Sequence, residues 1–538
     1  MRDVPDVHVP GLVAPSPLAG VRAAVATWPE RTALELAGRA WTYAELWRDA
    51  GRIATAIRTN ARSDAPFVTI LASRSSTAYL GSLAIFGAGR AHVALNPAHP
   101  PARTARVLAL AGADVLLVDR DSEGALLALL HATPADARPR TVIAPESNAD
   151  LVRGAFPDVH VVGAGEIGDM DAAMDAPEPP ASALAYLVFT SGSTGEPKGI
   201  AIDHGALATY MRNFRALMAP TPDDRLATTY ELTFDIALHD MLQAWWSGAA
   251  LCVAPARALA APAHFIRSNR ITWWFSVASV AMLLERQGVL RPGVFSSLKV
   301  SLLCGEPLPV RSAAAWAAAA PSSTLHNVYG PTETTMELAF HRFDPAEASR
   351  RGVVAIGIPF ADHAHVLLDD AGAEVVGEGQ GELYVSGPQL AVGYWKDPDR
   401  TARAFVTLPA RSGRWYRTGD LVERDACGVY HFVSRVDFQV KLRGHRIELG
   451  EVEAALREAV GSDLAVVIPH PFDGANAKGL VAFAVGEPRA DGELRAALAA
   501  HLPASMIPDR FVWLDTLPLN ANRKVDRGAL ADRLTRGE

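Results

Sequence analysis

Short apolar runs alternate with longer amphipathic stretches over much of the chain. The runs are bounded by turn residues, which predicts buried strands at FVTILAS (67–73), ADVLLVD (113–119), TVIAP (141–145) and VSLLCG (300–305). Between them lie segments with apolar residues at helical spacing, such as ARTARVLALAG (102–112). Alternating strands and helices are typical of stacked βα units with largely parallel sheets, so we predict an α/β fold.

The pattern changes toward the C-terminus. Residues 370–395 have frequent glycines and short strand-like pieces, which predicts a β-rich subdomain. Residues 434–446 are polar and charged, and the helical pattern ELGEVEAALREAV follows. Because 538 residues are too many for one hydrophobic core, we predict separate domains. The predicted parts are a large N-terminal domain over 1–434, a hinge over 435–437, and a small, mobile α+β domain over 438–538.

The composition is that of a globular protein. Hydrophobic residues make up 49% and charged residues 20% of the chain, which excludes wholesale disorder. A net charge of −8 opposes a polyphosphate backbone, and no dense run of Lys and Arg with interleaved aromatics occurs. We therefore expect no nucleic-acid partner.

Cysteine usage and the N-terminal segment indicate a reducing compartment. Cys252, Cys304 and Cys427 are far apart and odd in number, which argues against a disulfide framework or a Cys-rich zinc site. The N-terminal MRDVPDVHVPGLV lacks the basic start and apolar core of a signal peptide, and no run approaches the length of a membrane span. We expect a cytoplasmic protein without a membrane partner.

The segment FTSGSTGEPKG (189–199) combines glycines, hydroxyls and a lysine in a predicted turn. It follows the apolar strand pattern ALAYLVF (183–189) and is not a Walker loop, because two residues separate Gly195 from Lys198. Glycines let backbone N–H groups converge, and hydroxyls add donors, which builds an anion nest. The predicted phosphate-binding residues are Thr190, Ser191, Gly192, Ser193, Thr194, Gly195 and Lys198.

This loop resembles the phosphate loop of the acyl- and aminoacyl-adenylate-forming superfamily. That superfamily includes acyl-CoA synthetases, luciferases and the adenylation domains of nonribosomal peptide synthetases. Further segments follow in the family's order: WTYAEL (41–46), TFDIALHDM (233–241), NVYGPTETT (327–335), GELYVSGPQLAVGYW (381–395), YRTGDL (416–421), RVDFQVKLRGHRIELGEVE (435–453) and PLNANRKVDR (518–527).

The resemblance implies attack of a carboxylate on the α-phosphorus of ATP, with magnesium pyrophosphate leaving. Because two anions must approach each other, the protein has to supply positive charge in an ordered site. The family's catalytic lysine corresponds to Lys524, although Arg523 stands where the family usually has glycine. Thr332 is implied to contact phosphate and Glu333 to bind Mg²⁺, a hard cation that suits a carboxylate.

The same resemblance implies a nucleotide site. Tyr329 would stack on adenine, Asn327 would meet its edge, and Asp420 would accept hydrogen bonds from the ribose hydroxyls. Arg435 resembles the family's nucleotide contact and Asp437 its hinge residue, while Ser434 replaces the usual glycine. The remaining residues expected at ATP are Gly305, Glu306, Val328 and Gly330.

Asp235 resembles the aspartate that pairs with the ammonium of an α-amino acid. A carboxylate in an apolar pocket is costly unless a cation meets it, and fatty or aryl acids carry none. The alternative is an aspartate that only favours its helix dipole. The rest of the implied pocket is Ile236, His239, Phe275, Leu302, Cys304, Val328, Met336 and Glu337. Of these, His239 and Glu337 could pair with each other, or Glu337 could receive a polar or cationic side chain.

We therefore predict a free-standing, AMP-forming amino acid–carrier protein ligase. With ATP and Mg²⁺ it would load an α-amino acid onto the phosphopantetheine thiol of a separate carrier protein, in natural-product (antibiotic) biosynthesis by analogy with the family. One alternative is a ligase for an acyl, aryl or β-amino acid that uses CoA or a carrier protein. Another is an inactive ligand-binding relative, which the presence of Glu333, Asp420 and Lys524 disfavours.

Overall fold

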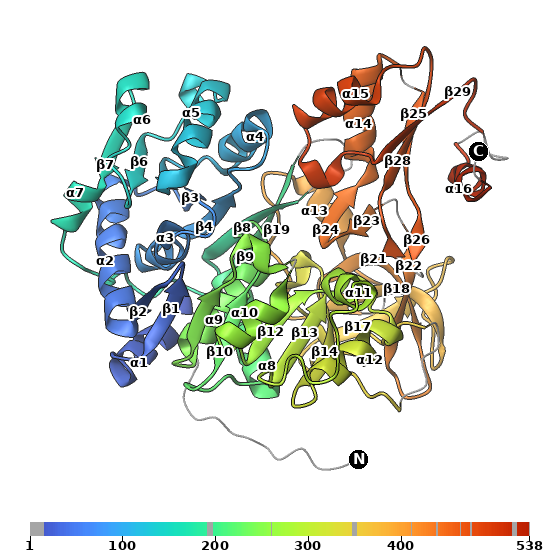
Figure 1. The fold of residues 1–538 in the computed structure, drawn as a ribbon, viewed down its shortest axis with the longest axis horizontal. Helices are drawn as coiled ribbons and strands as arrows, with labels where there is room; N and C mark the ends of the chain where they lie inside the picture. Colours follow the sequence, from blue (N-terminus) through green and yellow to red (C-terminus); the bar gives the residue numbers. More distant parts are fainter. Residues whose placement is uncertain are drawn as a thin grey trace.

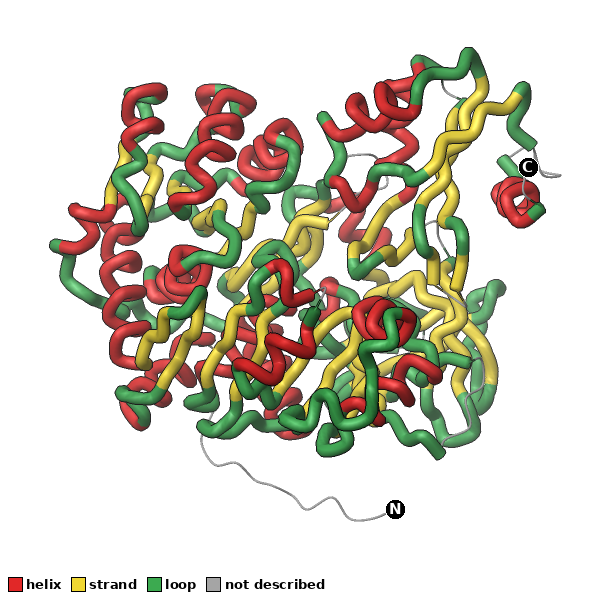
Figure 2. Tube along the Cα trace, in the orientation of Figure 1, coloured by secondary structure: helices red, strands yellow, loops and turns green. Residues whose placement is uncertain are grey.

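Two large sheets flanked by helices form the N-terminal part of the molecule (Figures 1 and 2). The structure is a computed structural model. It describes residues 16–190, 197–259, 261–346, 352–409, 411–436, 439–462, 464–473, 476–518 and 525–536.

The first large sheet contains the predicted run of parallel strands. Its strands are β3 (Phe67–Leu71), β4 (Ala91–Leu95), β5 (Val115–Val118), β6 (Thr141–Ala144), β7 (His160–Gly163), β8 (Leu184–Thr190), β9 (Lys198–Asp203) and β19 (Gly393–Tyr394). Within the described residues their order is β19-β9-β8-β4-β3-β5-β6-β7. The strands from β8 to β7 in this order are parallel to one another, whereas the β8–β9 and β9–β19 pairs are antiparallel.

The second large sheet has the order β16-β15-β14-β13-β12-β10-β11-β1-β2 in the described part of the chain. Its strands are β1 (Thr32–Leu36), β2 (Arg39–Thr42), β10 (Arg225–Thr228), β11 (Ala250–Val253), β12 (Trp273–Val277), β13 (Val300–Cys304), β14 (Thr324–Tyr329), β15 (Ala339–Arg342) and β16 (Ile358–Pro359). The carboxyl ends of β12, β13 and β14 share one edge because these strands are parallel.

Helices cover these sheets and join them. They are α1 (Pro17–Thr27), α2 (Tyr43–Asn60), α3 (Ser76–Gly87), α4 (Pro101–Ala111), α5 (Glu123–Ala132), α6 (Asp150–Ala155), α7 (Ala164–Gly168), α8 (His204–Leu217), α9 (Asp235–Trp246), α10 (Pro262–Ser268), α11 (Ala278–Arg286) and α12 (Val310–Ala319). The WTYAEL segment begins α2 with a capping box between Thr42 and Glu45. Trp245 of α9 is fully buried and donates from Nε1 to Ala33 O of β1 at 2.9 Å.

A five-stranded antiparallel sheet forms the predicted β-rich part. It consists of β17 (Ala364–Leu368), β18 (Gly379–Ser386), β20 (Phe405–Val406), β21 (Trp415–Arg424) and β22 (Tyr430–Arg435), with α13 (Pro398–Ala404) between two of them. The segment 370–395 does not stay within it, since β19 pairs with β9 of the first large sheet instead.

The C-terminal part is a small α+β unit. Its strands are β23 (Gln439–Leu442), β24 (His445–Glu448), β25 (Ala465–Pro469), β26 (Phe472–Asp473), β27 (Asn476–Ala477), β28 (Leu480–Val485) and β29 (Arg510–Leu514), and its helices are α14 (Leu449–Val460), α15 (Asp491–Ala499) and α16 (Arg527–Thr535). Alternate residues of β25 and β28 face α14 and α15 on one side and α16 on the other.

The antiparallel pair β23 and β24, called here the hairpin, lies between the C-terminal helices and the large sheets (Figure 1). β22 ends at Arg435, where the hinge is predicted, but Asp437 lies outside the described residues and the domain boundary stays a prediction. The predicted helices at 102–112 and 448–460 correspond to α4 and α14, and the α/β fold is confirmed. Among the helices that the structure describes, none is long and apolar enough to cross a membrane.

Candidate active site

A cavity of about 180 Å³ lies where strands of the two large sheets end. Thr190 ends β8, Cys304 ends β13 and Gly330 follows β14, and all three line the cavity. Ligands of open α/β sheets bind outside the carboxyl ends of the strands, so this is the expected place for a site. The hairpin closes it from the opposite side with Lys441, Gly444, His445 and Arg446.

The cavity brings many of the sequence-predicted residues together. Those that line it are Thr190, Asp235, Ile236, Cys304, Gly305, Gly330, Thr332, Met336, Glu337, Asp420 and Arg435. The predicted residues that the structure places outside this lining are Lys198, His239, Phe275, Leu302, Glu306, Asn327, Val328, Tyr329 and Glu333. Outside the described residues lie Ser191, Gly192, Ser193, Thr194, Gly195, Asp437 and Lys524, and the roles predicted for them stay predictions.

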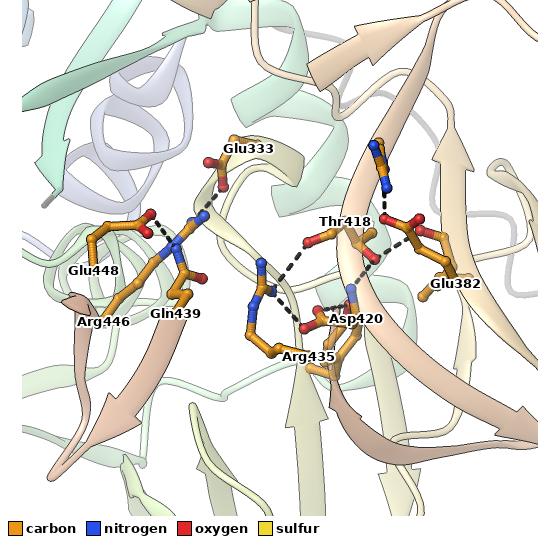
Figure 3. A network of polar contacts seen from close by, with 11 residues as sticks. Glu333, Glu382, Thr418, Asp420, Arg435, Gln439, Arg446 and Glu448 are labelled. Carbon is orange, nitrogen blue, oxygen red and sulfur yellow. Dashed lines mark hydrogen bonds and ion pairs between the residues drawn. The ribbon is translucent and has the colours of Figure 1, made fainter. Parts of the chain in front are cut away.

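Glu333 is fully buried, and its charge is met by the hairpin. Arg446 Nη1 lies 2.7 Å from Glu333 Oε2 (Figure 3), and Tyr394 OH donates to Glu333 Oε1 at 2.8 Å. Burial alone would raise the pKa of this carboxyl, but the cations of Arg446 and Lys198 lower it to about 2. The group therefore stays ionised at neutral pH.

Lys198 is also engaged by the hairpin. Its side chain is 8% exposed, and Nζ lies 3.0 Å from Glu448 Oε1. Gln439 donates to the same Glu448 oxygen at 2.6 Å (Figure 3). Burial is the largest influence on Lys198 and lowers its pKa, with a further contribution from Arg446. The hairpin thus supplies both a cation to Glu333 and an anion to Lys198.

A second polar network surrounds Asp420. Its side chain is almost fully buried, and its two oxygens accept from Tyr329 OH and from Arg435 Nη1, each at 2.6 Å. Arg435 also donates to Thr418 O at 3.1 Å, which holds the guanidinium beside the cavity (Figure 3). Tyr329, Asp420 and Arg435 are therefore brought together as predicted for a nucleotide site, although the nucleotide contacts themselves stay predictions.

Asn327 is placed differently from its predicted role. Its side chain is buried and donates from Nδ2 to Val354 O at 3.2 Å and to Ala355 O at 2.8 Å. Both amide hydrogens are therefore used within the protein. These donors hold the backbone at residues 354 and 355, and the predicted contact of Asn327 with the adenine edge stays a prediction.

The turn after Glu333 has an unusual backbone. Thr335 and Met336 have φ of +59° and +62°, a region that side chains other than glycine seldom adopt. Gln389 is fully buried and holds this turn, since its Nε2 donates to Thr334 O and Glu337 O, both at 3.2 Å. A Cβ on Gly330 would lie 2.3 Å from Met336 O, so only glycine lets the turn fold back. This backbone presents Met336 and Glu337 to the cavity.

Asp235 occupies the first turn of α9 and faces the cavity. It is 7% exposed, and Oδ2 has no hydrogen-bond partner among the described residues. Burial raises the pKa of Asp235 to about 6, while the Thr332 hydroxyl and the helix N–H groups partly offset this. An ionised Asp235 therefore leaves one carboxylate oxygen free to meet a cationic ligand.

His239 lies one turn further along α9, behind Asp235 and outside the lining of the cavity. Tyr210 OH and His239 Nδ1 share a hydrogen bond of 2.6 Å, and the His239 ring centroid lies 4.6 Å from Phe214 and 5.1 Å from Phe275. The sequence left open a pairing of His239 with Glu337. In the structure His239 pairs with Tyr210 instead. This aromatic cluster limits the depth of the pocket.

Further contacts fix the C-terminal part against the large sheets. Gly444 N donates to Glu306 Oε1 at 2.9 Å, and Asn476 Nδ2 donates to Pro307 O at 2.8 Å. Arg103 of α4 forms an ion pair with Glu451 of α14. A second cavity, of about 680 Å³, runs beside the first and shares Glu231, Phe234, Gly444 and His445 with it; its cations are Arg74, Arg286, Arg443 and Lys478.

Comparison with known proteins identifies the family. A family model described as AMP-binding enzyme matches residues 21–395, which is more than half of the chain. The chain belongs to the AMP-binding enzyme family.

Its relatives confirm the superfamily and fold predicted from the motifs. Tyrocidine synthase 3 of Brevibacillus parabrevis is 34% identical over 93% of this chain, but the chain spans only 7% of that protein. The L-proline–(L-prolyl-carrier protein) ligase of Streptomyces coelicolor is 36% identical, with 82% of this chain and 83% of that protein covered. The Vibrio cholerae adenylation domain AlmE, solved in complex with glycyl-adenosine-5'-phosphate, aligns with a TM-score of 0.87 at 28% identity and covers 98% of this chain and 99% of its own.

The residues of this AMP-binding enzyme fit ATP and Mg²⁺. Thr190 Oγ1 is buried without a hydrogen-bond partner in the described structure, which leaves it available to a phosphate oxygen. Lys198 supplies a buried positive charge, and Glu333 supplies a hard carboxylate. No group of three or more His, Cys, Asp and Glu within the described residues could hold a metal ion. Mg²⁺ takes one or two carboxylates and completes its shell with water and substrate phosphates, so Glu333 is the residue that would hold it.

Sequence reasoning missed four residues of this site. Tyr394 and Gln389 belong to the quoted segment GELYVSGPQLAVGYW, and Arg446 and Glu448 to RVDFQVKLRGHRIELGEVE. Their position within these family motifs was the only feature of the sequence that could have indicated a role in the site. Their partners lie far away in the chain, since Arg446 and Glu333 are 113 positions apart, so no local pattern indicates the contacts.

We expect Asp420→Asn to weaken AMP binding about 10- to 100-fold, since hydrogen bonds to charged groups contribute roughly 1.5–3 kcal/mol. Titration calorimetry with AMP measures the affinity. Asp425→Asn is the matched control, because Asp425 lies in the turn after β21, bonds to His431 at 3.1 Å and does not line the cavity. Equal affinity for AMP in both variants would contradict the assignment of Asp420 to the nucleotide.

Proposed function

We propose that this protein activates an α-amino acid with ATP and then transfers the aminoacyl group to the phosphopantetheine thiol of a separate carrier protein. In the first step a carboxylate oxygen bonds to the α-phosphorus of ATP, and the bond to pyrophosphate breaks. In the second step the thiol sulfur bonds to the acyl carbon, its proton is released, and AMP leaves. The carrier ligase and the glycyl-adenylate complex among the relatives support this proposal.

The observation that carries the proposal is the free carboxylate oxygen of Asp235 inside the cavity. A buried carboxylate without a cation is costly, and the described protein residues supply none to Asp235. The ammonium of an α-amino acid meets this need, whereas a fatty or aryl acid does not. The helix dipole alone does not explain a carboxylate that faces a cavity.

The chain's own residues divide the work of the first step. Asp235 orients the amino acid through its ammonium, and Asp420 and Arg435 hold the nucleotide. Thr190, Thr332 and Lys198 face the phosphates. Mg²⁺ held by Glu333 would neutralise charge on the departing pyrophosphate. Lys524 is proposed as the cation between the carboxylate and the α-phosphate; it lies outside the described residues.

The contacts of the hairpin support the view that the structure has the conformation used in the second step, transfer of the aminoacyl group to the thiol. Arg446 and Glu448 engage Glu333 and Lys198, the groups proposed to hold Mg²⁺ and pyrophosphate. The hairpin and magnesium pyrophosphate therefore compete for the same side chains. With the hairpin in place, the second cavity offers a thiol arm a route to the acyl carbon, because it shares four residues with the first.

The alternatives differ in acid and acceptor. CoA carries the same phosphopantetheine arm as a carrier protein, so the second cavity suits both, and a comparison of CoA with a holo-carrier protein as acceptor separates them. Acids without an α-amine leave Asp235 unpaired. An inactive relative is disfavoured, since Lys198, Glu333 and Asp420 all lie at one site.

The central test is exchange of labelled pyrophosphate into ATP in the presence of single candidate acids. We expect α-amino acids to stimulate exchange and their matched acids without the amine, such as propionate for alanine, to give the background rate. Stimulation only by acids without an α-amine would refute the amino-acid assignment. If none of the candidate acids stimulates exchange, the protein is the inactive relative.

The pKa of Asp235 predicts the pH dependence of amino-acid activation. Burial raises this pKa to about 6, so the free enzyme carries a neutral Asp235 below that pH and loses the charge that pairs with the ammonium. We expect kcat/KM for the amino acid to fall about tenfold per pH unit below about pH 6. Asp235→Asn should lower kcat/KM and remove this dependence. An unchanged profile in the variant would exclude Asp235 as its origin.

Arg446→Gln is expected to separate the two steps. The change removes the cation that the hairpin presents to Glu333, so transfer to a holo-carrier protein should fall at least about tenfold. Pyrophosphate exchange should stay within about threefold, because Glu333 then remains available to Mg²⁺. Arg457→Gln on α14, which pairs with Glu453 away from the cavity, is the control. A parallel loss of both steps in Arg446→Gln would argue against the assigned role of the hairpin.

A further inference from the structure

Glu337 is a buried acid in the substrate pocket whose charge is not met by the protein. It is 2% exposed and lines the cavity, and its Oε2 has no hydrogen-bond partner in the part of the chain that the structure describes. Its neighbours are the Cys304 thiol and the carboxyl group of Asp235. Cys304 in turn lies 3.5 Å from Tyr230 OH. None of these groups is a cation, and the Lys441 ammonium, which also acts on Glu337, forms no ion pair with it within the described residues.

The other buried acids of the site are treated differently. Glu333 pairs with Arg446 and Asp420 pairs with Arg435. Lys441 lines the same cavity as Glu337, but it forms no ion pair with Glu337 within the described residues, and its Nζ lies 6.0 Å from the Tyr329 ring centroid. Burial and the nearby Asp235 raise the pKa of Glu337 well above its usual value. The pocket therefore holds two carboxyl groups, Asp235 and Glu337, that form no ion pair within the described residues, unlike Glu333 and Asp420.

The pocket is also short. The ring of His239 packs against Phe214 and Phe275 and is bonded to Tyr210, and all four side chains are buried. They fill the space beyond Asp235 on α9. A substrate side chain that enters the cavity therefore ends near Glu337 and Cys304, and a long chain such as that of lysine or arginine meets this aromatic base.

We propose that the amino acid is a short diamino acid, whose α-ammonium pairs with Asp235 and whose side-chain ammonium pairs with Glu337. This inference rests on the proposed function and names its substrate class. One or two methylene groups would separate Cα from the second amine, as in 2,3-diaminopropionate and 2,4-diaminobutyrate. Glu337 is then the specificity-determining residue.

A second cation explains the pair of carboxylates better than a neutral side chain. An alkyl group would leave the carboxyl group of Glu337 without a partner, and each such buried polar group is costly. A hydroxyl would satisfy one hydrogen bond, but burial and the nearby Asp235 would still oppose the ionised form of Glu337. Two ammonium groups complete both pairs and leave the pocket neutral before the substrate carboxylate is counted.

The test compares matched amino acids in the pyrophosphate exchange assay. The panel is alanine, serine, 2-aminobutyrate, 2,3-diaminopropionate, 2,4-diaminobutyrate and lysine. We expect kcat/KM for one of the two short diamino acids to exceed that of its neutral counterpart about 10- to 100-fold, the range given by a lost hydrogen bond to a charged group. Binding of the corresponding aminoacyl sulfamoyladenosines, measured by calorimetry, should show the same order without any chemical step.

Glu337→Gln keeps the shape of the side chain and removes its charge. We expect it to lower kcat/KM for the diamino acid about 100-fold and to leave that for alanine within about threefold. The matched control is Asp240→Asn, a buried carboxyl on α9 that does not line the cavity, and it should leave the ratio between the two amino acids unchanged. Unchanged AMP affinity in both variants shows that the nucleotide site is intact.

The outcomes separate this inference from the proposed function. Preference for alanine, serine or 2-aminobutyrate over both diamino acids would overturn the inference and leave amino-acid activation intact. An equal loss for all amino acids in Glu337→Gln would also overturn it, because Glu337 would then be structural. If no amino acid stimulates exchange, the proposed function itself is overturned.

Discussion

A fully buried carboxylate, Glu333, has to be met by a positive charge, and the site is organised around this constraint. In the structure Arg446 of the hairpin supplies the charge, with Tyr394 on the other oxygen. The proposed Mg²⁺ would need the same carboxylate. Because a buried acid of this kind is costly when unpaired, the proposed function implies two favourable arrangements, with Arg446 or with Mg²⁺ at Glu333, and a poor one between them. The same holds for Lys198: Glu448 pairs with its ammonium group, which is proposed to contact phosphate when the nucleotide is bound.

The substrate pocket uses the opposite arrangement. Asp235 and Glu337 are buried in the same cavity as these networks, but each keeps an oxygen without a partner among the described residues. The ion pair of Glu333 with Arg446 positions the hairpin, and that of Asp420 with Arg435 positions a predicted nucleotide contact. At Asp235 and Glu337, which line the cavity, we propose that the ligand brings the cation. In the proposed function, this difference separates Glu333 and Lys198, which would exchange partners between the two steps, from Asp235 and Glu337, which would bind the amino acid.

Much of the fold is predictable from local pattern. The apolar runs at 67–73, 113–119 and 141–145 become β3, β5 and β6 because each is long enough for a buried strand and is bounded by turn residues. The membership of β19 in the first large sheet is not predictable, since two residues pair with a strand about 190 positions earlier. The motifs alone also assign Asp235, Thr332 and Glu337 to one site, and all three line the cavity.

The hydrogen-bond partners of the site residues could not be predicted from the sequence, because they lie on other elements of the fold. The i, i+4 spacing puts Asp235 and His239 on one face of α9, but only the packing of α8 against it shows that His239 bonds to Tyr210. Asn327 stands in the expected motif and turns to Val354 and Ala355, because buried amide hydrogens bond to the nearest free carbonyl groups. Lys524 lies outside the described residues, and its role rests on the motif alone.

Competition between the hairpin and magnesium nucleotide for Glu333 is tested most directly by a distance measurement. Spin labels at Leu217→Cys on α8 and Ala497→Cys on α15, in a Cys427→Ser background, report the position of the C-terminal part, while Cys252 and Cys304 are buried. The ligand-free protein should give the distance of this structure. Mg²⁺ with α,β-methylene-ATP should shift the population to a second distance, and Arg446→Gln should enhance the shift. A single unchanged distance under all of these conditions would contradict the account.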